Sequence, residues 1–269
     1  MILVPTRTLS AGAVAQLTQY QNQIDAELVY SARVLLAKQR FKQVNRKSNM
    51  TFREIRDTLS QMCSGSRRCM YCEDSASDEV EHYLPKDLYP ERVFQWDNYL
   101  YACGPCNGPK KNNFAVFDQG GALVEVARAR HSPVLPPTPG NPVLLGPRFD
   151  DALNYMKLDI AGDTFLFVPI DTNNADEQQR ADYTIRILGL NSRDYLPKAR
   201  REAYANYRAH LLDYVNARNG GGTAVRLGRI RDTVRTMCHP TVWAEMKRQS
   251  ASIAELALLF GTAPEVLGW

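Results

Sequence analysis

The residues best suited to chemistry lie in one stretch that two Cys-x-x-Cys pairs enclose. The pairs are Cys69 with Cys72 and Cys103 with Cys106. A structural Zn²⁺ takes four thiolates in a tetrahedron, and two short chelating turns can supply them. A thioredoxin-like redox motif needs only one such pair, in a βαβ setting that this sequence lacks. The spacing therefore predicts a closed structural zinc site, with Cys63 and Cys238 left as ordinary thiols.

A second set of side chains between the pairs suits the hydrolysis of a phosphodiester. That reaction needs a base to take a proton from the attacking water and a cation to stabilise the developing oxyanion. His82 is the one His of the stretch and the natural base. Glu81 and the amide oxygen of Asn107 are hard ligands for a catalytic Mg²⁺ or Mn²⁺. Asn98 is expected to hydrogen-bond across its loop and to hold the strand that carries His82.

Neighbouring residues leave alternatives open. Successive strand residues point to opposite faces, so Glu81 and His82 share a metal site only where the strand ends or bulges. Asn112 and Asn113 are alternative ligands. Lys110 and Lys111 follow Asn107 by one turn; we expect them to contact phosphate, the other interpretation being solvated side chains.

These motifs resemble those of the HNH endonucleases of the ββα-metal type, in a His-Asn-Asn variant with a four-Cys zinc knuckle. The similarity covers residues 67 to 117. It implies that His82 is the general base, that Asn98 is the structural Asn and that Asn107 opens a helix and binds the catalytic ion. Family members usually have Asp before the His, whereas this chain has Glu81.

The run from Cys-x-Tyr-Cys-Glu through Glu-His-Tyr-Leu-Pro-Lys to Cys-Asn-x-x-Lys is similar to one subgroup, the HNH proteins of Septu-type anti-phage systems, some of them attached to retrons. The segment from Thr184 to Asn191, with Arg193 after it, agrees more loosely. This resemblance implies an effector nuclease that works with an ATPase partner of the ABC/SMC-like kind. The alternative is a non-catalytic zinc module that binds nucleic acid or a protein.

The periodicity of apolar residues predicts an α+β fold that is mostly helical, in three parts: a helical segment over 1–66, the nuclease core over 67–117 and a region of connection, hairpin and helices over 118–269. We expect one helix over 10–42, with Leu17, Tyr20, Ile24, Leu28 and Leu35 on one face, and a capping box at 51–54 that opens a second helix. Strands are expected at 79–83 and 93–96.

The C-terminal part is expected to begin with an irregular, Pro-rich connection after residue 117. A hairpin should pair 156–160 with 164–169. Helices should follow over 181–188, 199–215, 224–237, 240–246 and 253–260.

The chain has 269 residues, of which 44% are hydrophobic, and a formal net charge of +4. This permits a nucleic-acid partner without demanding one. Basic residues at 198, 200 and 201, and at 226, 229, 231 and 235, indicate solvated helix faces or a path for phosphates. The apolar N-terminus is too short for a signal peptide, and no apolar run could span a membrane, so we expect a cytoplasmic protein.

Overall fold

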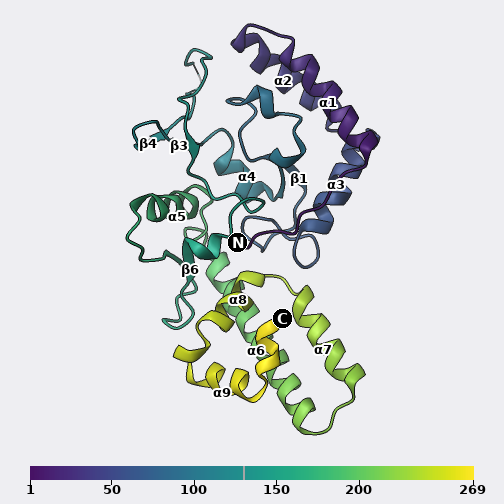
Figure 1. The fold of residues 1–269 in the computed structure, drawn as a ribbon, viewed down its shortest axis with the longest axis vertical. Helices are drawn as coiled ribbons and strands as arrows, with labels where there is room; N and C mark the ends of the chain where they lie inside the picture. Colours follow the sequence, from purple (N-terminus) through teal and green to yellow (C-terminus); the bar gives the residue numbers. More distant parts are fainter. Residues whose placement is uncertain (130) are drawn as a thin grey trace.

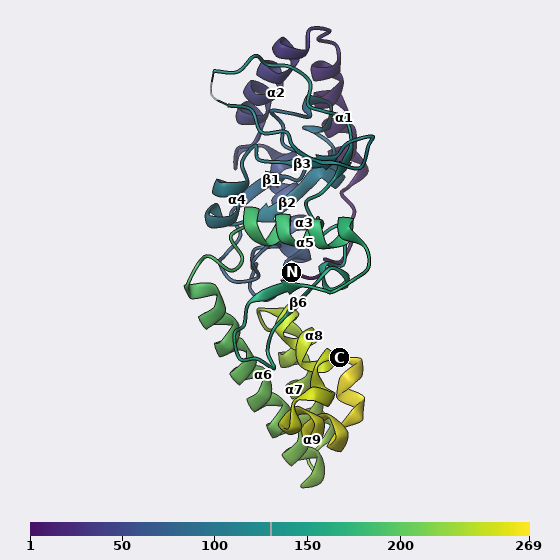
Figure 2. The ribbon, with the colours of Figure 1, turned by 90° about the vertical axis from the view of Figure 1, so that its left-hand side faces the viewer.

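The structure is a computed structural model that describes residues 1–129 and 131–269. The expected fold class is confirmed: the chain is an α+β protein dominated by helices, with three small sheets in its described part. The N-terminal helices lie in the upper part of the molecule in Figures 1 and 2, and the helices after residue 194 form the lower part. One cluster of buried hydrophobic side chains extends from Met1 to Val266. The division into three domains stays a prediction.

Three helices make up the N-terminal part: α1 (Ala11–Asp25), α2 (Tyr30–Val44) and α3 (Met50–Met62). The prediction of one helix over 10–42 is wrong, because the chain turns between residues 26 and 29. Leu28 lies in this turn and is 86% exposed, so it does not join the apolar face. The turn lets α2 pack back against α1.

The expected capping box at residues 51–54 is also wrong. Asn49 caps α3, since its side-chain oxygen accepts a hydrogen bond from the Phe52 backbone N–H at 3.2 Å. Glu54 instead accepts hydrogen bonds from the backbone and hydroxyl of Ser10, the cap of α1. The Glu54 carboxylate is thus bound to Ser10 of another helix and not to the backbone at the start of its own helix.

The central part contains β1 (Glu79–His82), β2 (Tyr99–Ala102) and α4 (Gly104–Lys110). The two strands pair antiparallel, with His82 opposite Tyr99. The strand predicted at 93–96 is wrong; short 3₁₀ turns occupy that region. All four residues of β2 are buried, so the strand has no alternation of polar and apolar residues that would reveal it. Helix α4 ends where Lys111 adopts a positive φ of 35°.

Small sheets and helices complete the chain. Two strands of the Pro-rich connection pair with β3, which comes just before it, in a sheet of order β4-β3-β5, formed by Leu123–Glu125, Ala115–Phe117 and Asn141–Pro142. The predicted hairpin is confirmed as β6 (Met156–Leu158) paired with β7 (Phe167–Pro169). The expected C-terminal helices are α5 (Ala175–Ile187), α6 (Tyr195–Asn219), α7 (Ala224–Thr236), α8 (Pro240–Arg248) and α9 (Ala254–Thr262). None of the described helices is both long and apolar enough to cross a membrane.

Candidate functional site

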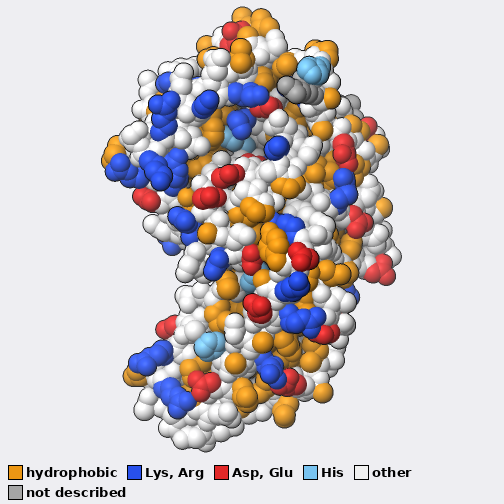
Figure 3. Space-filling view, turned by 180° about the vertical axis from the view of Figure 1, so that it is seen from behind, with side chains coloured by type: hydrophobic (Ala, Val, Ile, Leu, Met, Phe, Trp, Pro, Cys, Tyr) orange, Lys and Arg blue, Asp and Glu red, His pale blue; other side chains and the backbone are white. Residues whose placement is uncertain are grey.

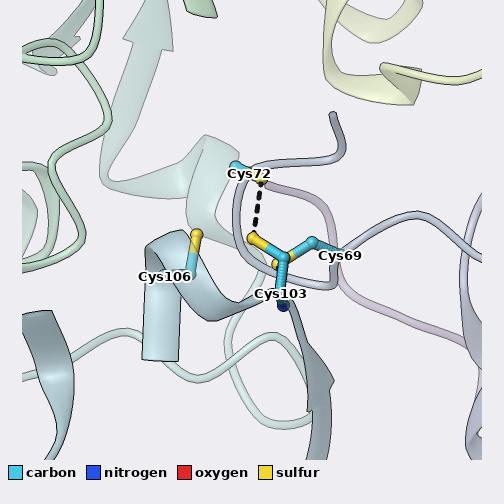
Figure 4. A group of neighbouring side chains, drawn as sticks. All are labelled: Cys69, Cys72, Cys103 and Cys106. Carbon is cyan, nitrogen blue, oxygen red and sulfur yellow. Dashed lines mark hydrogen bonds between the residues drawn. The ribbon is translucent and has the colours of Figure 1, made fainter. Parts of the chain in front are cut away.

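Four buried sulfurs form a cluster where the two Cys-x-x-Cys pairs meet. Cys69 and Cys72 lie in the turn after α3, Cys103 follows β2 directly, and Cys106 lies in α4 (Figure 4). All four ligand atoms lie within 4.8 Å of one another, and the sulfurs of Cys72 and Cys103 are 3.8 Å apart. Four thiolates at about 2.3 Å from one Zn²⁺ would lie roughly 3.8 Å apart, so the donors fit a tetrahedral zinc ion.

The environment of the cluster also suits a cation. Burial raises the pKa of Cys69 well above its ordinary value, whereas hydrogen bonds from Cys103 and the other thiols lower the pKa of Cys72. Burial and mutual repulsion oppose the loss of protons from all four thiols at once. A bound divalent cation would offset the negative charge of the thiolates. Nη2 of Arg193, from the loop after α5, donates a hydrogen bond to the Cys106 sulfur at 3.3 Å. This contact joins the C-terminal part of the chain to the cluster.

A cavity of about 630 Å³ is lined by β1, one edge of which pairs with no other strand among the described residues. Residues 78–81 form one wall, and the end of α4 with Lys111 and Asn112 forms the next. Helices α2 and α3 supply the opposite wall. Of the residues expected to act in catalysis, Glu81 and Asn107 line this cavity, whereas His82 and Asn98 do not.

Glu81 is held by a buried ion pair. Its Oε1 lies 2.6 Å from Nζ of Lys110, which also donates to the His82 carbonyl at 2.7 Å. The Lys110 side chain is fully buried, so the prediction that it contacts phosphate is wrong. The Glu81 carboxylate balances the buried charge of the Lys110 ammonium group, and the contact holds the end of α4 against β1. Lys111 is exposed and lines the cavity, and its contact with a phosphate stays a prediction.

Asn107 lies in the middle of α4 and does not open it, because the helix begins at Gly104. Its Nδ2 donates a hydrogen bond to Oε2 of Glu79. This bond leaves the amide oxygen, the atom that a divalent ion would bind, outside the contact. Glu79 and Glu81 are two residues apart in β1 and so share one strand face. Glu79 is absent from the residues expected to act in catalysis. Its spacing of two residues from Glu81 in a predicted strand indicates that the two side chains share a face.

His82 lies on the other face of β1. Its Nε2 donates to the Val93 carbonyl at 3.0 Å, and its ring packs edge-on against Phe41, with centroids 4.5 Å apart. Burial, followed by the positive charge of Lys86, lowers the pKa of His82 well below the usual value. The ring is therefore neutral at pH 7, with Nδ1 as its unprotonated nitrogen. Phe41, whose ring contacts the imidazole, lines the cavity, and so does Lys86.

Asn98 braces the loop between β1 and β2. Its Oδ1 accepts from the Leu84 N–H at 2.7 Å, and its Nδ2 donates to the carbonyls of Leu84 and Arg92. Asn98 is buried within the loop and does not line the cavity that contains Glu81 and Asn107. Of the alternative ligands, Asn112 lines the cavity and donates to Asp87, whereas Asn113 donates to the Pro109 carbonyl.

Among the described residues, only the four Cys bring three or more His, Cys, Asp or Glu ligand atoms together. Glu81 and His82 are successive residues of β1 and point to opposite faces of the strand, whereas Asn107 comes from α4. The chemistry that the arrangement allows combines carboxylates and an amide at an open cavity with a neutral imidazole directly behind its wall.

Comparison with known proteins gives one relative for part of the chain. A stretch of 57 residues is 48% identical to the Septu protein PtuB of Bacillus thuringiensis. The match spans 19% of this chain and 22% of the length of that protein. No protein-family model matches the chain. Over this segment the chain is therefore a partial homologue of a Septu protein, and it carries a buried four-Cys cluster that can hold a metal such as zinc.

Proposed function

We propose that the chain is a metal-dependent endonuclease that cleaves nucleic acid in an anti-phage defence system. The observation that carries the proposal is the cavity at β1, which collects Glu81, Asn107 and Lys111 and is also lined by Phe41, whose ring packs against His82. The partial similarity to a Septu protein supports the role in defence. DNA is the favoured substrate, with RNA as the second.

In this mechanism each group has one task. A Mg²⁺ or Mn²⁺ ion, when bound, would stabilise charge on the phosphate oxygens, and the oxygens of Glu81 and Asn107 would hold it. His82 would take the proton of the attacking water at Nδ1, since Nε2 is occupied by the Val93 carbonyl. Lys111 would position a phosphate. Zinc at the four Cys would fix the end of β2 and the start of α4 to the turn that carries Cys69 and Cys72.

Cleavage of plasmid DNA, single-stranded DNA and RNA with Mg²⁺ or Mn²⁺ tests this proposal. Asn107→Ala is the best single variant, because Asn107 borders the cavity and its loss should spare the fold. His82→Ala removes the proposed base, and His210→Ala, on α6, is the matched control. We expect the first two variants to lose cleavage and the control to keep it. Equal cleavage by all three and by the parent protein would reject the assignment.

A non-catalytic zinc module is the second candidate, and one observation favours it: the residue His82 is only 2% exposed. In that case Cys69→Ser should abolish function while Asn107→Ala leaves it intact. The resemblance to Septu proteins leads us further to propose an ATPase partner of the ABC/SMC-like kind. Co-purification of such an ATPase with the tagged chain would support this, and full activity of the isolated chain would contradict it.

A further inference from the structure

The helices α2 and α3 carry a dense positive charge on their outer side. Between Arg33 and Arg56 the chain has eight Lys or Arg residues and one carboxylate, Glu54. This basic segment lies outside the stretch between the Cys pairs. The ratio of eight to one is far from the near balance of the whole chain, with 33 basic and 29 acidic residues.

The charge lies on one side because α2 is amphipathic. Its buried residues, spaced three or four apart, are Val34, Ala37, Phe41 and Val44. The basic residues on its outer side and in the following turn are exposed, namely Lys38, Lys42, Arg46 and Lys47. Figure 3 shows Lys and Arg side chains gathered over these N-terminal helices, on the upper left of that face.

Most of this charge is left without an acidic partner. Within the described part of the chain, Lys42, Arg46, Lys47 and Arg53 take part in no ion pair, whereas Lys38 pairs with Asp87. Like charges held close together repel one another unless an anion neutralises them. A surface kept in this state suits a partner with many regularly spaced negative charges.

The basic segment is continuous with the cavity. Lys38, Lys47 and Arg56 line the cavity that also contains Glu81 and Asn107. Lys111 borders the same cavity from α4. A chain of phosphates that follows the outer side of α2 would therefore enter the cavity beside the carboxylates.

The basic residues of the C-terminal part are placed differently. Arg226 and Arg231 both belong to α7. Arg226 pairs with Asp213 of α6, and Arg231 pairs with Asp232 of α7. Helix α7 lies at the end of the molecule opposite to α2, as Figures 1 and 2 agree. Arg200 is buried and donates to the carbonyls of Phe165 and Leu190, so it supports the core and no surface.

We infer that the outer side of α2 and the α2–α3 turn bind the sugar–phosphate backbone of the nucleic acid and guide it into the cavity. The inference rests on the proposed nuclease function but concerns binding alone. Backbone contacts of this kind are independent of sequence and weaken steeply with salt, because each phosphate that is neutralised releases a counterion.

The test measures binding separately from cleavage. A short fluorescent DNA duplex is titrated with Asn107→Ala protein, which should bind without cutting, over a range of salt concentrations. Lys42→Glu with Lys47→Glu is then added to this protein, and Arg226→Glu with Arg229→Glu is the matched control on α7. We expect the first pair to weaken binding at least tenfold and to reduce the slope of log K against log salt by roughly 0.9 per lost phosphate contact. The control should change neither quantity.

Unchanged binding in the Lys42/Lys47 protein would overturn the inference, and so would an effect confined to the Arg226/Arg229 protein. Absence of any binding by the parent chain to duplex DNA, single-stranded DNA and RNA would overturn it too. Binding that depends on Lys42 and Lys47 would support this inference even if the parent protein cleaved no substrate. That second result would reject the proposed nuclease activity alone. Zinc content and circular dichroism of each variant identify any loss of fold.

Discussion

Nζ of Lys110 lies 2.6 Å from Oε1 of Glu81, and both side chains are buried at the contact between α4 and β1. The ammonium group makes a second hydrogen bond, to the His82 carbonyl. The pair thus ties the helix that carries Cys106 and Asn107 to the strand that carries Glu81 and His82. An ion pair in this position fixes the geometry of the cavity wall.

Lys110→Met should destabilise the fold by about 3–5 kcal/mol, because it leaves the Glu81 carboxylate buried without its partner. Urea unfolding followed by circular dichroism measures the change. Lys111→Met, one residue further on and exposed, is the control and should stay within about 0.5 kcal/mol of the parent. The double variant Glu81→Gln with Lys110→Met should recover part of the loss; a Lys110→Met protein as stable as the parent would contradict this account.

Acid should destabilise the protein through His82. The folded state lowers the pKa of this ring, so below the ordinary value of about 6.5 the unfolded chain binds a proton that the folded chain refuses. The stability contributed by the neutral ring is therefore complete above that pH. It falls by up to about 1.4 kcal/mol per pH unit as the pH drops from 6.5 towards the folded pKa.

Urea unfolding of the parent and of His82→Asn from about pH 7.5 to about pH 5.5, roughly one unit either side of the ordinary His value, tests this effect. The parent should be more stable than His82→Asn at about pH 7.5, and its advantage should shrink as the pH falls. Titration of the thiols affects both proteins alike, so it cancels when one stability is subtracted from the other. A constant difference would mean that His82 titrates alike in both states.

Phe41 should control access to His82. Phe41→Ala removes the ring that packs edge-on against the imidazole and lines the cavity. Solvent should then reach the imidazole and raise its pKa towards the ordinary value, at a cost in stability of about 3–5 kcal/mol. NMR titration of the His82 ring protons measures the pKa; no rise would show that Phe41 does not seal the site.

Arg193 should strengthen the hold of the four Cys on zinc. Its guanidinium donates to the Cys106 sulfur and so offsets the negative charge of a four-thiolate site. We expect Arg193→Met to weaken zinc binding by about 10–100-fold. Competition with a colorimetric chelator measures this affinity. Arg186→Met is the control, since Arg186 is exposed and pairs with Glu125; equal zinc affinity in both variants would rule out the role.

Local sequence predicted the elements whose signals are strong and short in range. The hairpin of β6 and β7 follows from a turn between two apolar runs, and α7 from apolar residues at helical spacing. The break at residues 26–29 was missed because no Gly or Pro marks it. Strand β2 was misplaced because a strand buried on both faces has no period of two to reveal it.

The sequence by itself predicted the four-Cys cluster, which can hold a metal such as zinc, since the spacing within each Cys pair gives two short chelating turns. Only the tertiary structure decided the roles of the side chains around β1. It buried Lys110 beside Glu81, paired Asn107 with Glu79 and placed Phe41 of α2 over His82. These contacts join residues from different elements, and burial, which turns a phosphate-binding lysine into a structural one, depends on what packs around a side chain.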